Sequence, residues 1–189
     1  MKDSKLHINN PHKGRYDFDT LTKCNPDLKE YIIDNPTGDM TVDFSNNKAV
    51  IEINKALLKQ YYNIDYWSIP EGFLCPPVPG RADYIHYISD LLQGEEDVKV
   101  LDIGTGANLI YPIIGSQALN WDFVATDIDK ESIENCSTII DKNSNLKERI
   151  ELRLQENKSN ILRGMIKEDD YFDLMMCNPP FHSSLQEAI

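Results

Sequence analysis

Short apolar runs alternate with amphipathic stretches through the second half of the chain. Four of these runs have the length and the branched or aromatic side chains of β-strands: residues 98–104, 121–129, 149–154 and 171–177. Apolar side chains recur at helical spacing in residues 108–119 and again after Asp129, a residue type that suits a helix N-cap. This order of strands and helices predicts a parallel, doubly wound α/β sheet whose strands are covered on both faces.

The first 80 residues follow a different pattern. Residues 1–40 are rich in Asn, Asp, Pro and Lys and hold only isolated apolar residues. This composition predicts an irregular arm with one short helical turn after Asn25-Pro26. Residues 40–44 favour a short strand, and Ser45 or Asn46 would cap a helix with apolar side chains at helical spacing.

A connector follows that helix. Residues 68–81 contain four prolines and two glycines, which is typical of a link between structural units. We therefore expect three parts along the chain: a basic arm at 1–40, a small strand–helix unit with its Pro-rich connector at 41–80, and the α/β domain at 81–189. The last part should begin with a helix that ends near Gly94.

Composition narrows the class of protein. Hydrophobic residues make up 41% of the 189 residues and charged residues 26%, which is the balance of a globular domain with a real core. No apolar run approaches the length of a membrane span, and the polar start is not a signal peptide, so we expect a cytoplasmic protein. The four cysteines are scattered without a C-x-x-C pair, which argues against zinc and against a disulfide framework.

The charge of the chain is uneven. The net charge of −12 argues against wide nonspecific binding of nucleic acid. However, residues 1–15 hold four Lys or Arg residues and one Asp, whereas the rest of the chain holds 15 basic and 30 acidic side chains. The basic start is compatible with a solvated tail or with an arm that contacts phosphates.

A glycine turn follows the first strand of the predicted sheet. Gly104 and Gly106 would let a ligand approach the backbone, but Leu109 stands where a dinucleotide fingerprint has its third glycine. Asp102 would repel a pyrophosphate and suits a ligand with a cationic centre and an amino group. Asp127 ends the second strand, where a carboxylate can hold both hydroxyls of a ribose.

S-adenosylmethionine matches this set of groups, because it has a sulfonium, an amino-acid tail, a ribose and no phosphate. A nicotinamide dinucleotide remains the alternative ligand, although the third glycine of its fingerprint is absent. An ordinary α/β domain with a glycine-rich first turn and no ligand at all also fits these features.

The motif "CNPPF" at residues 177–181 ends the fourth strand. If this strand lies beside the first one, the side-chain oxygen of Asn178 and the carbonyl of Pro179 can accept both N–H bonds of a planar amine and direct its lone pair at the methyl donor. Pro180 stiffens the turn, and Phe181 offers a face for stacking a base. The alternative is a purely structural role, in which a proline-rich turn ends the strand. We expect Cys177 to lie in the core rather than act as a nucleophile.

Several segments resemble the ribosomal RNA large subunit methyltransferase F family: "PGRADYIHYISDLL", "LDIGTGANLIYPIIG", "VATDID" and "CNPPF". The N-terminal "INNPHKGRYDFDTL" and "NPDL" resemble that family's basic, RNA-contacting module, so the resemblance runs from about residue 7 to the end. It implies a Rossmann-like class I S-adenosylmethionine-dependent methyltransferase sheet with a small N-terminal α/β extension. It also implies methylation of the exocyclic amino group of an adenine in bacterial 23S ribosomal RNA.

The resemblance assigns roles where residues match. Arg81 would meet the carboxylate of the donor, and Gly104, Thr105 and Gly106 would form the donor turn. Asp127 would hold the ribose, and Ser159 stands where some relatives place a Thr near the adenine. The adenine pocket would comprise Asn178, Pro179, Pro180 and Phe181. The candidates for contacts with RNA phosphates are Lys5, His7, His12, Lys13 and Arg15.

The implied partner is 23S ribosomal RNA or an assembly intermediate of the large subunit, and the implied enzyme is a monomer without a metal. Members of the family continue beyond this motif with three more strands and a loop over the substrate. Because this sequence stops at Ile189, we expect a sheet truncated after its fourth strand, with the donor half complete and the last strand as an open edge.

Other functions stay open at this level. Methylation of a protein glutamine, as in release-factor methyltransferases with Asn-Pro-Pro-Tyr at this strand, requires the same amide chemistry. Methylation of DNA adenine is a further rival. A non-catalytic RNA-binding protein on a methyltransferase fold is the alternative outside the enzymes.

Overall fold

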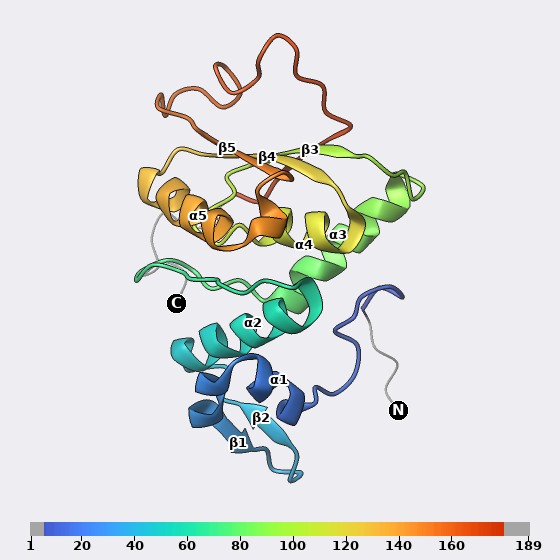
Figure 1. Ribbon diagram of the computed structural model, residues 1–189, viewed down its shortest axis with the longest axis vertical. Coiled ribbons are helices and arrows are strands. Elements are labelled where there is room, and N and C mark those ends of the chain that lie inside the picture. The colour runs from blue at the N-terminus through green and yellow to red at the C-terminus, as the bar shows by residue number, and fades with distance from the viewer. Residues whose placement is uncertain (1–5, 180–189) are drawn as a thin grey trace. The chain divides into compact units, whose positions relative to one another are not determined.

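The computed structural model describes residues 6–179, which form two compact units (Figure 1). The first unit combines the residues up to Ser68 with Cys75–Glu95, and the second combines Ile69–Leu74 with the residues from Glu96 onward. The predicted boundary at residue 81 falls inside a helix of the first unit. The roles that the sequence suggests for the three parts stay predictions.

The second unit is built around a four-stranded parallel sheet in the order β5-β4-β3-β6. Its strands are β3 (Lys99–Ile103), β4 (Asp122–Asp127), β5 (Ile150–Leu154) and β6 (Leu174–Cys177). The predicted parallel α/β sheet is therefore confirmed, and the last strand lies beside the first, as expected. Each of these short strands carries apolar side chains at positions that the sheet buries, such as Val100, Leu101 and Val124.

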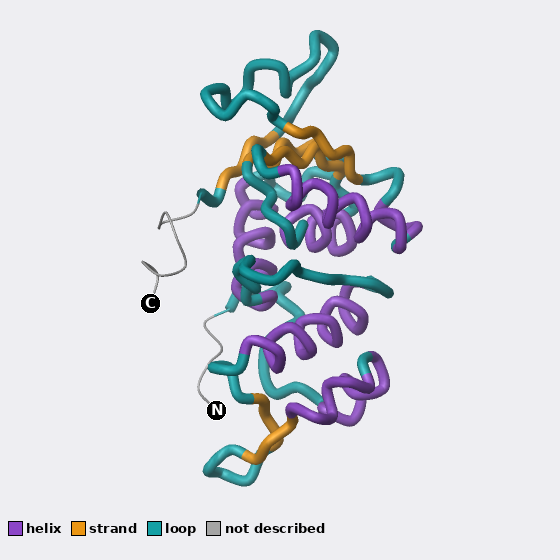
Figure 2. The backbone as a smooth tube through the Cα atoms, turned by 90° about the vertical axis from the view of Figure 1, so that its left-hand side faces the viewer, coloured by secondary structure: helices purple, strands orange, loops and turns teal. Residues whose placement is uncertain are grey.

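Helices α4 (Ile110–Leu119) and α5 (Lys130–Lys142) cover one face of this sheet. Figure 2 shows the long connection between β5 and β6 over the opposite face, so only one face is covered by helices within the described part of this unit. Helix α4 approaches β4 closely at Gly115, where a Cβ atom would lie 2.4 Å from Cζ of Phe123. The close helix–strand contact that a glycine at position 109 would provide is thus made six residues further on, at Gly115.

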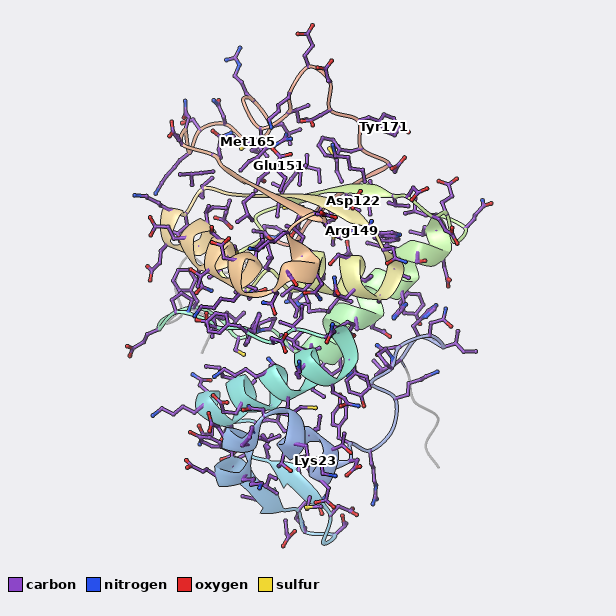
Figure 3. The ribbon with its side chains drawn as sticks, in the orientation of Figure 1. Lys23, Asp122, Arg149, Glu151, Met165 and Tyr171 are labelled. Carbon is purple, nitrogen blue, oxygen red and sulfur yellow. The ribbon has the colours of Figure 1, made fainter. Side chains whose placement is uncertain are left out.

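The connection between β5 and β6 is tied to the sheet by a buried arginine. The Arg153 side chain is 7% exposed and donates hydrogen bonds to Glu151, to Asp170 and to the carbonyl of Met165. Figure 3 shows Glu151 and Met165 on the side of the sheet where this connection runs. The arginine lowers the pKa of Glu151 to about 2 and also lowers that of Asp170. The buried charge is therefore fully paired, which a buried arginine requires.

The first unit contains α1 (Phe18–Cys24), the 3₁₀ turn η1 (Pro26–Tyr31), β1 (Ile32–Asp34), β2 (Met40–Val42), α2 (Asn47–Tyr62) and α3 (Val78–Leu91). The predicted strand at 40–44 and helix after Asn46 are confirmed, and the Asn46 side chain caps α2 by accepting hydrogen bonds from the Lys48 and Ala49 amides. Helix α2 buries Ile53, Leu57 and Leu58.

Two expectations for the first unit were wrong. The helical turn predicted after Asn25-Pro26 is present as η1, but the start of the chain is more regular than an irregular arm, because Asp17 caps α1 and β1 pairs with β2 as an antiparallel hairpin. Helix α3 begins at Val78 rather than at residue 81, because prolines fit the first turn of a helix, where no backbone donor is needed. Among the described residues, no helix combines the length and apolarity that a membrane span requires.

Candidate functional site

The turn that follows β3 leaves free space beside its main chain. The amides of Gly104 and Thr105 both donate to the carbonyl of Thr126 at 2.9 Å, which joins the turn to β4. Gly104 and Gly106 have φ angles of 75° and 66°, a region that favours glycine. A Cβ atom added at Gly104 would meet nothing within 4 Å, so there is free space above this residue. The turn can therefore accept a ligand against its main chain.

Helix α5 supports this turn from the side of the core. The Cys136 thiol donates to the carbonyl of Gly106 at 3.1 Å, and the Asn135 side chain donates to the carbonyl of Ala107 at 2.7 Å. Burial raises the pKa of Cys136, so the thiol stays protonated and remains a donor. The sequence gave no signal that Cys136 holds the glycine turn.

Asp127 joins the end of β4 to the glycine turn. Its Oδ2 accepts a hydrogen bond from the Gly106 amide at 2.8 Å, and its Oδ1 accepts one from the Asp129 amide at 2.9 Å. Its carbonyl accepts from the Gln155 amide at 2.8 Å. The carboxylate is thus held rigidly, and each of its oxygens retains acceptor capacity for a further partner. This is the position at which the sequence predicted a ribose contact.

Asp102 and Thr105 are buried with polar atoms that lack a partner. Asp102 is 1% exposed and Thr105 6%, and neither Oδ2 of Asp102 nor Oγ1 of Thr105 has a hydrogen-bond partner among the described residues. Burial raises the pKa of Asp102 to about 7; the nearby Thr105 hydroxyl opposes this rise, and the negative charge of Asp127 contributes to it. A buried carboxyl group with unused acceptor capacity is a typical feature of a binding site for a donor group.

The carboxyl end of β6 lies at the same edge of the sheet. Ile103 of β3 pairs with Cys177 of β6, and because the strands are parallel, the next residues, Gly104 and Asn178, follow side by side. Asn178 is half-buried and Pro179 is exposed. Pro180 and Phe181, which complete the predicted adenine pocket, lie outside the described residues.

Cys177 is exposed, which corrects the expectation that it belongs to the core. Strand β6 is at the end of the sheet order, and its side chains alternate between the buried Met176 and the exposed Met175 and Cys177. Desolvation and the charge of Asp102 raise the pKa of the Cys177 thiol, so its thiolate is disfavoured.

Ser159 lies in an exposed turn after β5, where its amide donates to Oδ1 of Asn157 at 3.0 Å. The turn is organised by Gln155, a buried residue that sequence reasoning missed. Its Nε2 donates to the carbonyl of Arg163 at 3.0 Å, and its Oε1 accepts from the Asn157 amide at 3.1 Å. The only signal for Gln155 in the sequence was its position as a polar residue directly after a buried strand. The contact of Ser159 with an adenine stays a prediction.

Two of the residues predicted to bind RNA phosphates are buried in the first unit. Nε2 of His12 lies 2.9 Å from the Tyr62 hydroxyl and Nδ1 lies 3.1 Å from the Tyr16 hydroxyl, while burial lowers the pKa of His12 to about 4. His7 bonds Asp90 through Nε2 at 2.9 Å and stacks on His86. These rings therefore pack the N-terminal segment and are not available to a phosphate, which corrects the expectation.

The basic side chains of the same segment are exposed. Arg15 forms an ion pair with Asp39, and the Lys13 ammonium donates to the carbonyl of Ile8. Lys5 lies outside the described residues. Arg81 lies on α3 in the first unit and is half-buried, and its predicted contact with a donor carboxylate stays a prediction.

A family model described as RNA methyltransferase matches residues 1–189. The chain belongs to this RNA methyltransferase family. Three curated relatives of this chain share the name "Ribosomal RNA large subunit methyltransferase F". The protein from Psychrobacter sp. (strain PRwf-1) is 55% identical over 98% of this chain and 59% of its own length. The protein from Desulfotalea psychrophila is 55% identical over 100% of this chain and 63% of its own length. The protein from Vibrio campbellii is 48% identical over 98% of this chain and 50% of its own length.

The chain thus covers 50–63% of the length of these relatives. Solved structures of the METTL16 methyltransferase domain are also similar. One has a TM-score of 0.83 at 30% identity, with 95% of this chain and 72% of that chain covered. The N-terminal domain of human METTL16 in complex with SAH has a TM-score of 0.83 at 31% identity, over 93% and 70%. The hMettl16 catalytic domain in complex with the MAT2A 3′UTR hairpin 1 has a TM-score of 0.83 at 31% identity, over 98% and 63%.

Among the described residues of this chain, no three His, Cys, Asp or Glu side chains are grouped as a metal site would need. The polar groups at the edge of the sheet are acceptors with unused capacity, which suits an organic ligand rich in donors better than a phosphate.

Proposed function

We propose that this chain is the donor-binding and RNA-contacting part of an enzyme that transfers a methyl group from S-adenosylmethionine to the exocyclic amino group of an adenine in 23S ribosomal RNA. The observation that carries the proposal is the pairing of Ile103 in β3 with Cys177 in β6, so that Gly104 and Asn178 both follow paired residues at the edge where Asp127 ends β4 and Asp102 lies one residue before the end of β3. The names of the curated relatives, and the METTL16 structures with SAH and with an RNA hairpin, support the same conclusion.

The residues present fit S-adenosylmethionine. When bound, this cofactor supplies a methyl group made electrophilic by a sulfonium. Oδ2 of Asp102 and Oγ1 of Thr105, which have no partner in the part of the chain that the structure describes, would accept hydrogen bonds from donor groups of the cofactor. Asp127 would accept those of the ribose hydroxyls. Arg81 would bind the carboxylate of the amino-acid tail, as the family resemblance implies. Two carboxylates at this edge disfavour a phosphate-bearing ligand.

Asn178 and Pro179 would orient the target amine. The lone pair of an adenine amino group is delocalised into the ring, so the group is planar and a poor nucleophile. Accepting its two N–H bonds with the Asn178 side-chain oxygen and the Pro179 carbonyl draws the nitrogen toward a tetrahedral geometry. Phe181 would provide the stacking face for the base. No side chain has to form a covalent intermediate.

The substrate can be tested directly. The protein would be incubated with isotopically labelled S-adenosylmethionine and, in separate reactions, with unmodified 23S ribosomal RNA, large-subunit assembly intermediates or release factors. We expect label in RNA, recovered as N6-methyladenosine after nuclease digestion and mass spectrometry. Label in the release factor alone would instead establish methylation of a protein glutamine.

Asp127→Ala is expected to weaken S-adenosylmethionine binding by about ten- to hundredfold, since hydrogen bonds to a charged group contribute roughly 1.5–3 kcal/mol. The Gly106 amide also loses its partner in this variant. The matched control is Asp122→Ala at the other end of β4, where Asp122 pairs with Arg149 (Figure 3). Isothermal titration calorimetry should show less than a twofold change for the control, and equal affinity for both variants would remove Asp127 from the donor site.

Lys13→Glu and Arg15→Glu are each expected to weaken RNA binding and to reduce the slope of log affinity against log salt by roughly 1, because each removes one phosphate contact. Lys23→Glu is the control, since Lys23 is an exposed base on α1 of the same unit (Figure 3). Fluorescence anisotropy at several salt concentrations measures the slope. A slope lowered as much by Lys23→Glu would mean that only the overall charge matters.

A further inference from the structure

A cleft in the first unit lies between the β1–β2 hairpin and the segment around Arg15. Its volume is about 450 Å³, within the range of roughly 300–1,000 Å³ that is typical of small-molecule sites. The residues that line it all belong to the first unit. None of them is assigned above to the donor or to the target amine, so the proposed reaction leaves this cleft unexplained.

Phe44 lines this cleft with 66% of its surface exposed, and Met40 lines it with 49% exposed. Burial of apolar surface stabilises a protein by roughly 25 cal/mol per Å², and Phe44 does not gain this stabilisation within its own chain. An exposed phenylalanine beside a cleft therefore indicates a surface that a ligand can cover. The backbone around Phe44 is fixed, because the Asp43 carboxylate accepts hydrogen bonds from the amide and the hydroxyl of Ser45 at 2.9 and 2.7 Å. The aromatic ring is therefore presented by an ordered turn, which lowers the entropy cost of binding a flat partner.

Asn35 provides an oriented amide in the same cleft. Its Oδ1 accepts hydrogen bonds from the Thr37 amide at 2.9 Å, the Thr37 hydroxyl at 2.7 Å and the Asp39 amide at 2.9 Å. Because the oxygen is fully engaged, the amide cannot turn over, and no acceptor for its Nδ2 is found among the described residues. Two N–H donors in a fixed direction can read the acceptor atoms on the edge of a base.

Arg15 forms the opposite wall. Its guanidinium pairs with Asp39, yet its side chain is 82% exposed, so it keeps donors for a second acceptor. The adjacent Lys13 is exposed as well, and both belong to the basic start of an otherwise acidic chain. A phosphate that adjoins the cleft would therefore meet positive charge, as the backbone of a bound single strand requires.

From these contacts we infer that the cleft binds an unpaired base of the RNA substrate, stacked on Phe44 and hydrogen-bonded by the Asn35 amide, with Arg15 at the neighbouring phosphate. The inference rests on the proposed function, since it takes the RNA as the ligand, and it adds a second site of base recognition. A folded protein partner fits less well, because a stable protein interface needs roughly 800 Å² on each side, far more than two exposed side chains present.

The experiment compares variants of the hairpin turn by fluorescence anisotropy, with an RNA hairpin that has an unpaired loop and with a fully paired duplex. Phe44→Ala should weaken binding of the hairpin by roughly five- to hundredfold and leave duplex binding unchanged, because stacking on a base is lost. Phe44→Trp should retain binding of the hairpin. The control is Ile33→Ala on β1, an exposed apolar side chain of the same hairpin that does not line the cleft and should change the affinity less than twofold.

Cross-linking of the unaltered protein to hairpins that carry 4-thiouridine gives an independent measure that does not depend on folding of a variant. Cross-links that map to residues 40–46 support the inference. Unchanged hairpin affinity in Phe44→Ala, or cross-links confined to other segments, would overturn it while leaving the RNA methyltransferase proposal intact. Absence of any RNA binding by the unaltered protein would contradict both the inference about the cleft and the proposed function.

Discussion

Asn178→Ala is expected to lower methyl transfer by about a hundredfold or more while donor affinity changes less than about threefold. The physical reason is that one preorganised acceptor at the reacting group typically contributes a factor of roughly 10²–10³ to the rate. Asn178 directly follows Cys177, which pairs with Ile103 of β3, so its position is set by the sheet rather than by a long loop. Single-turnover transfer of a labelled methyl group measures the rate, and calorimetry measures donor binding.

The control for this prediction is Cys177→Ala. Cys177 is the preceding residue on the same strand and is exposed, and its raised pKa disfavours the thiolate that a nucleophile would need. Transfer by Cys177→Ala should stay within about twofold of the unaltered protein. If Cys177→Ala abolished transfer and Asn178→Ala did not, the reaction would run through the thiol, and the direct transfer proposed here would be wrong.

Asp102→Asn is expected to stabilise the fold at pH 8, by about 1–3 kcal/mol in the free energy of unfolding. Burial raises the pKa of Asp102 from 3.8 to about 7. The folded state thus holds a proton that the unfolded chain releases, and the stabilisation from that proton is complete below about pH 4 and lost as the pH rises through about 7. A rise in pKa of this size changes the free energy of unfolding by at most roughly 4 kcal/mol. The neutral amide avoids the buried charge at pH 8.

Urea unfolding at pH 5 and pH 8 measures this effect. The advantage of Asp102→Asn over the unaltered protein should be larger at pH 8 than at pH 5, because Asp102 is still protonated in the folded state at pH 5. Asp122→Asn, at the exposed end of the neighbouring strand, should show no such dependence. A variant that is less stable than the unaltered protein at pH 8 would mean that the carboxylate has a stabilising partner.

The same substitution should weaken donor binding by about tenfold or more, because the amide replaces a carboxylate that would face the amino group of the donor. Donor affinity of the unaltered protein should correspondingly rise between pH 6 and pH 8, as Asp102 ionises. Gain of stability together with loss of binding distinguishes a residue kept for function from one kept for the fold.

The sequence by itself determined the local elements of the second unit. Helix α5 begins after Asp129 because a carboxylate can cap the Ser132 amide, and strands β3 and β4 follow from short apolar runs that end at turn residues. The candidate positions Gly104, Asp127 and Asn178 could be named for the same reason: Gly104 and Asn178 directly follow a strand and Asp127 ends one, and the carboxyl ends of parallel strands meet at one edge.

Only the tertiary structure decided what surrounds those residues. The hydrogen bond from Gly106 to Asp127, the buried Asp102 without a partner and the buried ring of His12 each depend on residues distant in the chain. Cys177 is exposed because β6 is last in the strand order, and the apolar run that contains it gave no sign of this. Periodicity reports which face of an element is apolar, whereas burial and pairing depend on which other element covers that face.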